Sequence, residues 1–319
     1  MATDAGFARR GRVPPSAVLG RARYDVRVSL DAQAEQNNAG NDGPEPVDVS
    51  VVIPMYREAR RIEATLRDAI EWLSRWDRTS EIVLVDDGSP DGTVGVVTPF
   101  VGEAAAGSPE RLRRITLVRH AQNRGKGAAV RTGLGASRGA WRLMMDADNS
   151  ARIREIEKLI PEAGSRVVLS AGSRNLAESR VRARAGRRLA GILFRTCLKT
   201  LGLAILRDTQ CGFKLYRADL AALIARVGAE DRFAFDLEHL LLAKRFAGRG
   251  HAQASIKEIG IEWEHKDGGT VRPIRDGLRM LARAAAIRSR FASDPTLARS
   301  ELELKPERSS VGSGRTPRV

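Results

Sequence analysis

Segments with the pattern of buried strands alternate with segments of helical periodicity along this chain, and this alternation limits the possible folds more than any other feature. Strands are expected in "VDVSVVIPMY", which ends at Pro54, and in "SEIVLVDDGSPDGT", "ITLVRH" and "AWRLMMDAD". Helices are expected in "REARRIEATLRDAIEWLSRW", in "VGVVTPFV", which Pro99 interrupts, and in "KGAAVRTGLGASR". This order predicts an α/β fold with a mostly parallel sheet flanked by helices.

Polar residues directly follow four of the expected strands. They are Pro54-Tyr56-Glu58, Asp86-Asp87, His120-Asn123 and Asp146-Asp148. Ligands of such sheets bind beyond the carboxyl ends of the strands, where these four groups would meet. The sequence therefore predicts the functional site at this edge.

Two nucleotide-binding motifs are absent from the expected positions. A dinucleotide-binding fold needs G-x-G-x-x-G after its first strand, where this chain reads "PMYREARR". A phosphate-binding P-loop needs G-K-[ST], and "NRGKGAA" lacks the hydroxyl residue that would hold magnesium. A different kind of nucleotide site is therefore expected.

The segment "LMMDADNS" carries Asp146 and Asp148 out of an apolar strand. Residues i and i+2 of a strand point to the same side, so the two carboxylates are expected side by side. Like charges at that distance repel each other, and each carboxylate resists desolvation. A divalent cation would relieve this repulsion, although D-x-D alone is a weak signal because aspartate is common where strands turn.

Six segments occur in one order at consistent spacing: "VVIPMYREARRI", "EIVLVDDGSPDGT", "NRGKGAAVRTG", "LMMDADNS", "AGSR" and "RDTQCGFKLYR". Together they resemble family 2 glycosyltransferases of the GT-A fold, a Rossmann-like α/β architecture. The similarity runs from about Val49 to Arg290, and "DTQCGFKLY" is most similar to the polyprenyl-phosphate (dolichyl-phosphate) glucosyltransferases. The resemblance implies inverting transfer of glucose from UDP-glucose to a polyprenyl phosphate.

The resemblance also implies which residues bind the donor and the metal. Asp146 and Asp148 are expected to hold Mg²⁺ or Mn²⁺, since hard oxygen ligands suit these ions. Asp87 or its neighbour Asp86 is expected to accept a hydrogen bond from N3–H of uracil. The expected donor-binding residues are Pro54, Tyr56, Glu58, Asp86, Asp87, Asn123 and Lys126. The turn signals in "DDGSPDGT" are also compatible with a plain turn and helix cap.

Further residues are expected at the acceptor side. Arg174 is placed near the diphosphate or the acceptor phosphate, or it is a surface arginine after a strand. Asp208 and Gln210 are expected to position the acceptor or the sugar, and Lys214 to supply charge. A lipid phosphate is already an anion and needs no general base. The expected acceptor-phosphate ligands are Arg184, Arg187 and Arg188.

Asp236 and Glu238 are open to two interpretations, a site role or capping of a helix N-terminus. His239 is expected to be structural. Many relatives of the subgroup carry Gly-Ser-Lys near a tryptophan, whereas this chain has Trp263 followed by Gly268-Gly269-Thr270. Lys266 or Arg272 is the candidate substitute for the missing lysine.

Two basic segments are open to two interpretations, contact with an anionic membrane surface or helices docked on the domain by an apolar face, and both can hold if the arginines face outward. The net charge is +15, and the stretch from Arg180 to Arg207 carries eight basic residues and no acid. In "RPIRDGLRMLARAAAIRSRF", helical spacing places Arg272, Arg275, Arg279 and Arg283 on one face and Ile274, Leu278, Leu281 and Ala285 on the other. The expected domains are a disordered arm (1–47), a GT-A domain (48–270), a basic amphipathic helix (271–292) and a disordered tail (293–319).

The amino-acid composition bears on the cellular location of the protein. No run of 18 apolar residues occurs, and no apolar segment follows the basic N-terminus, so neither a spanning helix nor a signal peptide is expected. Only Cys197 and Cys211 are present, which excludes a disulfide scaffold and favours a reducing cytosol. The expected location is the cytoplasm, peripherally at the inner face of the membrane.

Two alternatives remain open at this level. The first is an enzyme of the same fold with another donor or acceptor, such as GDP-mannose or a soluble acceptor. The second is a basic nucleic-acid-binding protein, which the 5% aromatic content and the lack of a nucleic-acid motif disfavour, so no nucleic-acid partner is expected.

Overall fold

The structure is a computed structural model that describes residues 47–101, 111–182, 204–248, 252–266 and 273–294. Its centre is a seven-stranded sheet with the order β3-β2-β1-β4-β7-β5-β8. The strands are β1 (Val49–Met55), β2 (Ser80–Asp86), β3 (Leu112–Arg119), β4 (Trp141–Met145), β5 (Leu169–Ser173), β7 (Phe213–Arg217) and β8 (Ile256–Gly260). Strand β7 runs antiparallel to both of its neighbours, and all other pairings are parallel. The expected mostly parallel sheet is confirmed.

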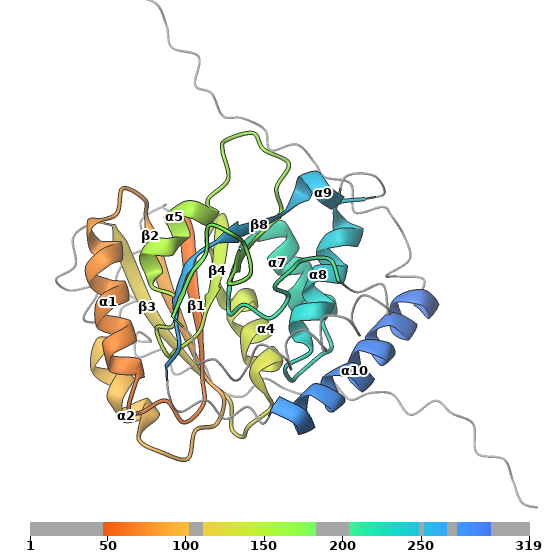
Figure 1. The fold of residues 1–319 in the computed structure, drawn as a ribbon. Helices are drawn as coiled ribbons and strands as arrows, with labels where there is room; N and C mark the ends of the chain where they lie inside the picture. Colours follow the sequence, from red (N-terminus) through yellow and green to blue (C-terminus); the bar gives the residue numbers. More distant parts are fainter. Residues whose placement is uncertain (1–46, 102–110, 183–203, 249–251, 267–272, 295–319) are drawn as a thin grey trace, which may run out of the picture.

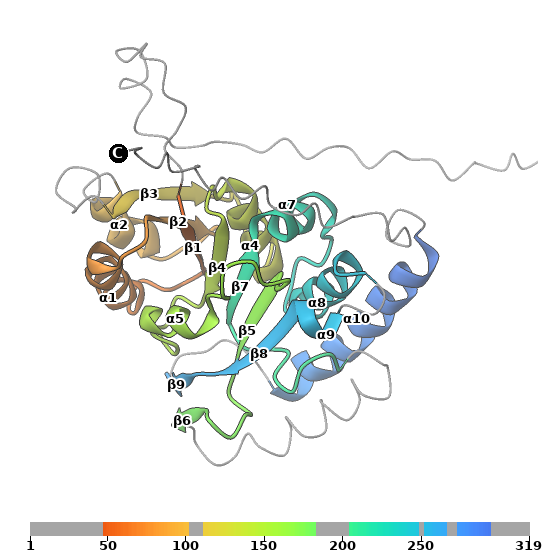
Figure 2. The same ribbon diagram turned by 90° about the horizontal axis from the view of Figure 1, so that it is seen from above.

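Helices cover both faces of the sheet (Figures 1 and 2). One face carries α1 (Ile62–Arg75), α2 (Thr93–Val97) with the short helix η1 (Thr98–Phe100), and α5 (Ile156–Leu159) with η2 (Ile153–Glu155). The other face carries α4 (Lys126–Ala136), α7 (Ala218–Val227) and α8 (Phe235–Phe246), with α9 (Ala252–Ser255) and α10 (Pro273–Ser293) beside them. Strands β6 (Arg180–Arg182) and β9 (Glu262–Glu264) form a separate parallel pair.

Side-chain alternation along the strands builds two cores. In β1, Val49, Val51 and Ile53 face α1, whereas Val52 faces α4. Both sets are fully buried, as expected for a parallel sheet covered on both faces. The same alternation turns residues that follow the strands toward opposite faces, which decides where the site residues point.

The register aligns the carboxyl ends of the strands. Met55 at the end of β1 lies opposite Asp86 at the end of β2, and Asp86 lies opposite Arg119 at the end of β3. The residues after β4 and before β7 reach the same edge, because Met145 pairs with Phe213. Four polar groups distant in sequence therefore meet at one edge of the sheet.

Helix α10 packs against the domain. Ala284, Ile287 and Phe291 are buried in the same core as α8. Ala285, which the sequence placed on the apolar face, is exposed. The expected face is wrong at this position because the buried stripe runs through 284, 287 and 291, one helical position away.

Candidate active site

A pocket of about 320 Å³ lies at the carboxyl ends of β1, β2 and β4. Its wall combines carboxylates, cations and backbone from five separate parts of the chain. The lining residues are Pro54, Met55, Tyr56, Glu58, Arg61, Asp87, Asn123, Gly125, Lys126, Ala129, Asp146, Ala147, Asp148, Arg232 and Phe233. Six of the seven expected donor-binding residues line this pocket, as do both expected metal ligands, Asp146 and Asp148; Asp86 does not line it.

The Asp146 carboxylate is fixed from two sides. Lys126 Nζ, at the start of α4, donates to Asp146 Oδ1 at 2.5 Å. Gly212 lies on the other side, where a Cβ atom would stand 1.9 Å from Asp146 Oδ2. Although burial alone would lower the pKa of Lys126, the Asp146 and Asp236 carboxylates raise it above its usual value. Lys126 therefore remains a cation beside the pocket.

The Asp148 carboxylate has fewer contacts among the described residues than that of Asp146. Within the described part of the chain, its carboxylate accepts one hydrogen bond, from the backbone N–H of Ser150 at 3.0 Å. The loop between the two aspartates is held by Thr65 of α1, whose Oγ1 donates to the carbonyl of Ala147 at 2.7 Å. Asn149 follows with a left-handed φ of 55°, a conformation that asparagine tolerates better than most residues.

The donor set fits a hard divalent cation shared with a ligand. Among the described residues, no group of three or more His, Cys, Asp or Glu side chains forms a complete protein cage for a metal. Asp146 and Asp148 supply oxygen atoms only, on the wall of an open pocket. Mg²⁺ is typically held by one or two carboxylates together with substrate phosphates and water, so two aspartates suffice.

Asp87 organises the loop before α4. Its Oδ1 accepts hydrogen bonds from His120 Nδ1 (2.7 Å) and Arg124 N (2.9 Å), and its Oδ2 from Asn123 Nδ2 (2.8 Å) and Gly125 N (2.7 Å). These four bonds use the acceptor capacity of the carboxylate. Asp87 thus shapes the pocket wall, and a uracil N3–H would find no free lone pair on it.

Asp86, the other candidate for uracil, has more capacity left. Its side chain is fully buried, receives weak bonds from Ser89 N at 3.3 Å, and lies 3.7 Å from Arg119 Nε. Alternation along β2 turns Asp86 toward the α1 face and Asp87 toward the α4 face.

Glu58 and Tyr56 form the rim that follows β1. Arg61 Nε and Nη2 bind the Glu58 carboxylate at 2.8 and 2.7 Å. Burial raises the pKa of Glu58 above its usual value, and the Arg61 guanidinium opposes this rise. Arg57, between the two, has a φ of 59° and lies over the Tyr56 ring, 5.3 Å from its centroid. Such a conformation is uncommon for arginine and is held here by the Arg57 N to Ser89 Oγ bond.

Arg174 and Asp208 form a second cluster at the same edge. Arg174 Nε and Nη2 donate to the two Asp208 oxygens at 2.7 and 2.8 Å, and the Arg174 backbone N–H adds a third bond at 2.9 Å. Burial would raise the pKa of Asp208, but the bonds and charge of Arg174 hold it below its usual value. The guanidinium also lies over Trp263, 5.3 Å from the ring centroid. Arg174 is thus more than a surface arginine after a strand.

Lys214 does not supply charge to the pocket as expected. Its side chain is fully buried, and Nζ donates to Asp236 Oδ1 and to the carbonyl of Cys211, both at 2.6 Å. The antiparallel strand β7 turns Lys214 toward α8, a direction that the sequence did not reveal. Asp236 is therefore the buried partner of this lysine.

Glu238 and His239 have structural roles. The Glu238 carboxylate accepts hydrogen bonds from the backbone of Ala229 and Glu230, just before its own helix. His239 is buried and its Nδ1 lies 3.1 Å from Tyr216 Oη. The structural interpretation of these two residues fits their positions.

The remaining expected residues divide into two sets. Gln210 lies before β7, and its buried Nε2 has no hydrogen-bond partner among the described residues. The candidate acceptor ligands, the substituted glycine loop and one of the two candidates to replace its lysine lie outside the described residues. They are Arg184, Arg187, Arg188, Gly268, Gly269, Thr270 and Arg272. The other candidate, Lys266, is described, and its Nζ pairs with Glu264 at 2.6 Å.

Sequence reasoning missed Arg232 and Phe233, which line the pocket from the loop before α8. Both directly precede "AFDLE", whose acids carry the clearer sequence signal. Their position depends on contacts with α4 and α10, which no local pattern encodes.

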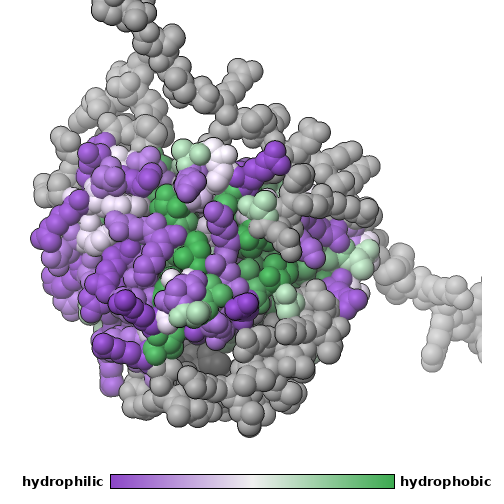
Figure 3. All heavy atoms as spheres, turned by 45° about the horizontal axis from the view of Figure 1, so that its top comes forward, coloured by the Kyte–Doolittle hydropathy of each residue, from purple (hydrophilic) through white to green (hydrophobic). Residues whose placement is uncertain are grey.

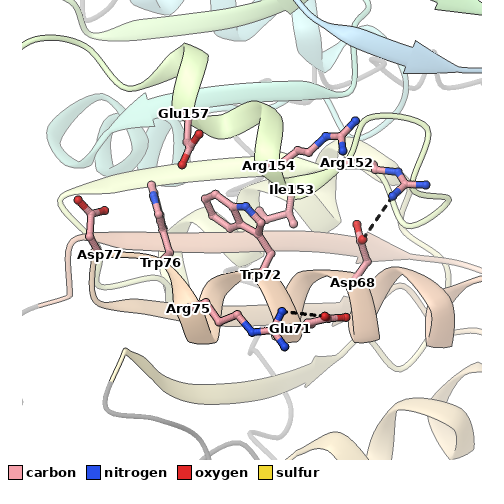
Figure 4. Close-up of a pocket in the computed structure, with 10 residues that line it drawn as sticks. All are labelled: Asp68, Glu71, Trp72, Arg75, Trp76, Asp77, Arg152, Ile153, Arg154 and Glu157. Carbon is pink, nitrogen blue, oxygen red and sulfur yellow. Dashed lines mark hydrogen bonds and ion pairs between the residues drawn. The ribbon is translucent and has the colours of Figure 1, made fainter.

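A larger pocket of about 610 Å³ lies between α1 and the 152–157 segment (Figure 4). The rings of Trp72 and Trp76 lie in it with centroids 4.7 Å apart and planes tilted by 41°. Two pairs of opposite charges lie in it, with Arg75 paired to Glu71 at 2.9 Å and Arg152 lying 3.9 Å from Asp68. None of the strand-end motifs reaches this pocket, so the smaller pocket is the candidate active site.

Comparisons with known proteins find one enzyme family. The sequence model described as Glycosyl transferase family 2 matches residues 50–223, which contain β1, β2 and both aspartates. The dolichyl-phosphate beta-glucosyltransferase of Saccharomyces cerevisiae is 34% identical over 308 residues, covering 89% of this chain and 87% of the relative. The enzyme of the same description from Dictyostelium discoideum is 31% identical over 262 residues, covering 77% and 76%.

Solved structures show the same fold. Glucosyl-3-phosphoglycerate synthase from Mycobacterium tuberculosis, crystallised with Mn²⁺ and UDP-glucose, matches with a TM-score of 0.55 at 18% identity, covering 76% of this chain and 77% of that one. Mannosyl-3-phosphoglycerate synthase from Rubrobacter xylanophilus matches with a TM-score of 0.55 at 17% identity, covering 79% and 76%. These similarities confirm the expected GT-A architecture.

Proposed function

Because this chain belongs to glycosyl transferase family 2 and is a glycosyltransferase, we propose that it transfers glucose from UDP-glucose to a polyprenyl phosphate, with inversion at the anomeric carbon. The glucose and the dolichyl-type acceptor come from the relatives, whose descriptions name both. The UDP donor and the metal are supported by a neighbour of the same fold that was crystallised with Mn²⁺ and UDP-glucose.

The pairing of Asp208 with Arg174 is the observation that most supports a phosphate acceptor over a hydroxyl acceptor. An acceptor hydroxyl needs a carboxylate that can take its proton, whereas a phosphate monoester is already an anion. Both Asp208 oxygens accept hydrogen bonds from Arg174, and the lowered pKa of Asp208 makes its carboxylate a poor base. The structure thus supports an acceptor that arrives deprotonated.

Other carboxylates at this edge of the sheet also accept hydrogen bonds from protein groups. Glu58 is bound by Arg61, Asp87 by the loop before α4, and Asp146 by Lys126. Asp148 is the exception among the described pocket residues, and the proposed mechanism uses it as a metal ligand. No carboxylate in this part of the chain is therefore left over for a base.

The proposed mechanism divides binding from stabilisation. The segment from Pro54 to Glu58, together with Asn123, holds the nucleoside, while Lys126 faces the diphosphate. An Mg²⁺ or Mn²⁺ ion at Asp146 and Asp148 would neutralise negative charge on the departing UDP. An oxygen of the acceptor phosphate bonds to the anomeric carbon on the face opposite UDP as the bond to UDP breaks.

Several residues orient the acceptor in this proposal. Arg174 and Asp208 form a pair beside the sugar in this proposal, and the Gln210 amide, which has no partner among the described residues, donates to the sugar or the phosphate. Preorganised positive groups stabilise both anions without reorganising, which is the main source of rate enhancement expected here. We assign the acceptor phosphate to Arg184, Arg187 and Arg188, which lie outside the described residues.

We also propose that the enzyme works peripherally at the cytoplasmic face of an anionic membrane, because its acceptor is a lipid. No helix within the described ranges is long and apolar enough to cross a bilayer. Figure 3 shows hydrophobic residues in a central band of one face, yet among the described residues the large hydrophobic side chain with marked exposure is Val181, at 38%. Charge is therefore the main contribution to membrane contact from the described part.

The direct test of the acceptor class compares a polyprenyl phosphate with the polyprenol of equal length. With labelled UDP-glucose and Mg²⁺, we expect transfer to the phosphate and none to the alcohol. Transfer to the alcohol at a comparable rate would show that a base is present and would overturn the assignment.

A further inference from the structure

Two buried acids next to the pocket have no part in the proposed reaction. Glu230 is 3% exposed and Glu238 is 1% exposed. Charged groups are rarely buried unless they are paired, so each needs a partner. Both find that partner in α10, more than forty residues further along the chain.

Two arginines of α10 form ion pairs with these acids. Arg283 Nε donates to Glu230 Oε2 at 2.8 Å. Arg290 Nη1 donates to Glu238 Oε1, and its Nη2 donates to the carbonyl of Val227 at 2.7 Å. One ion pair is formed by Glu230, within a short segment, 229–234, which we call the pocket loop, and the other by Glu238 in α8, which follows that segment.

The two acids hold the backbone of the pocket loop. Glu238 accepts the N–H groups of Ala229 at 3.0 Å and of Glu230 at 2.9 Å. Glu230 Oε1 receives a longer bond from the backbone of Arg232 at 3.4 Å. If an arginine of α10 is lost, a buried carboxylate loses its countercharge, and the loop it holds is the part that moves most readily.

The pocket loop is joined on its other side to the start of α4. The carbonyl of Asp231 accepts the N–H of Ala128 at 3.1 Å, and Arg131 pairs with the Asp231 carboxylate. Gly125 and Gly127 allow this approach, because a Cβ atom at either would stand 2.3 Å from a carbonyl oxygen of the loop. Between these glycines is Lys126, the residue bound to Asp146.

We propose that Arg283 and Arg290 are positioning residues for the donor pocket, acting through Glu230 and Glu238 on the pocket loop. The loop places Arg232 and Phe233 on the pocket wall and supports the glycine segment that presents Lys126. Helix α10 is thus part of the donor site without touching the nucleotide. This inference rests on the proposed function, because it takes the pocket to be the site for a sugar nucleotide.

The test uses the full chain and its variants Arg283→Met and Arg290→Met, each of which keeps a long side chain without charge. Arg288→Met, an exposed arginine on the same helix, is the matched control. UDP affinity is measured by calorimetry with Mn²⁺, and amide hydrogen exchange is followed in segments 125–131 and 228–238. Arg283→Lys, which restores a cation, serves as the conservative rescue.

We expect both Met variants to remain folded, to exchange faster in those two segments, and to bind UDP about tenfold more weakly, a coupling typical of linked sites. Arg288→Met should match the wild type, and Arg283→Lys should recover part of the lost affinity. Faster exchange with unchanged UDP affinity would overturn the inference, as would unchanged exchange. Failure of the wild type to bind UDP would instead contradict the proposed function.

Discussion

Asp146 and Asp148 lie two residues apart, yet they have different surroundings. Asp146 faces α4, where Lys126 neutralises part of its charge, while Asp148 carries only a backbone bond from Ser150 among the described contacts. The repulsion expected from the sequence is therefore partly relieved by the protein itself. We propose that a divalent cation relieves the rest and gives Asp148 its role.

Asp148→Asn should reduce transfer by a factor on the order of 10² or more, as removal of one charge-stabilising group does in other enzymes. The free energy of unfolding should change little, because the carboxylate makes one backbone bond. Transfer by the wild type should require added Mg²⁺ or Mn²⁺ and should stop with a chelator. Full activity of the variant in chelator would exclude the metal hypothesis.

Gly212→Ala should displace the Asp146 carboxylate, because the added Cβ would lie 1.9 Å from Oδ2. We expect weaker Mn²⁺ binding, seen by calorimetry in the presence of UDP, and slower transfer. Gly95→Ala is the matched control, since nothing lies within 4 Å of a Cβ atom there. Equal Mn²⁺ affinity in the two variants would show that Asp146 does not hold the ion.

Asp208 should make the free energy of unfolding depend on pH. Its folded pKa lies below the unfolded value, so its contribution is present above the unfolded pKa of about 4 and is lost as pH falls through the folded pKa. Asp208→Asn should therefore be less stable than the wild type near pH 7, and the difference should shrink in acid. Chemical unfolding at several pH values measures this, and a constant difference down to the acid limit would refute it.

Strands and helices with strong local patterns were predictable from the sequence. Strand β2 and helix α4 occur where expected, and Pro99 ends α2 at Val97, after which only a short η1 turn follows. The carboxyl-edge location of the site followed from the parallel order of the strands. These features depend on local periodicity and on a general rule of topology.

Features that depend on distant partners were not predictable. The antiparallel direction of β7 buries Lys214 against Asp236, and the bonds of Asp87 close a loop almost forty residues away. The pocket loop owes its position to arginines of α10. In each case the contact joins residues that are distant along the chain, which one sequence does not specify.

Helix α10 remains our candidate for membrane contact, but Arg283 is committed to Glu230. We therefore expect Arg275→Glu/Arg279→Glu, with Arg283 intact, to reduce co-sedimentation with anionic liposomes, since each arginine contributes on the order of 1 kcal/mol. Binding of the wild type should weaken in high salt and with neutral lipid. If the double variant folds and sediments like the wild type, the stretch from Arg180 to Arg207 is the remaining candidate.

At the scale of the whole molecule, the donor pocket and α10 belong to one packed unit. The core that contains α4, α7 and α8 also contains Ala284, Ile287 and Phe291 of α10. A helix proposed to lie at a lipid surface is thus packed within the domain that holds the nucleotide site. This arrangement suits a water-soluble donor and an acceptor that stays in the membrane.

The central claim is transfer of glucose from a uridine donor to a lipid phosphate, and one measurement tests it most directly. The protein is incubated with Mg²⁺, native membrane lipids, and labelled UDP-glucose or GDP-mannose in parallel, and the labelled lipid is identified by mass spectrometry. We expect a glucosyl monophosphate polyprenol from UDP-glucose alone, with none from the Asp148→Asn variant. A mannosyl lipid from GDP-mannose, or label that appears only in a water-soluble product, would contradict the account.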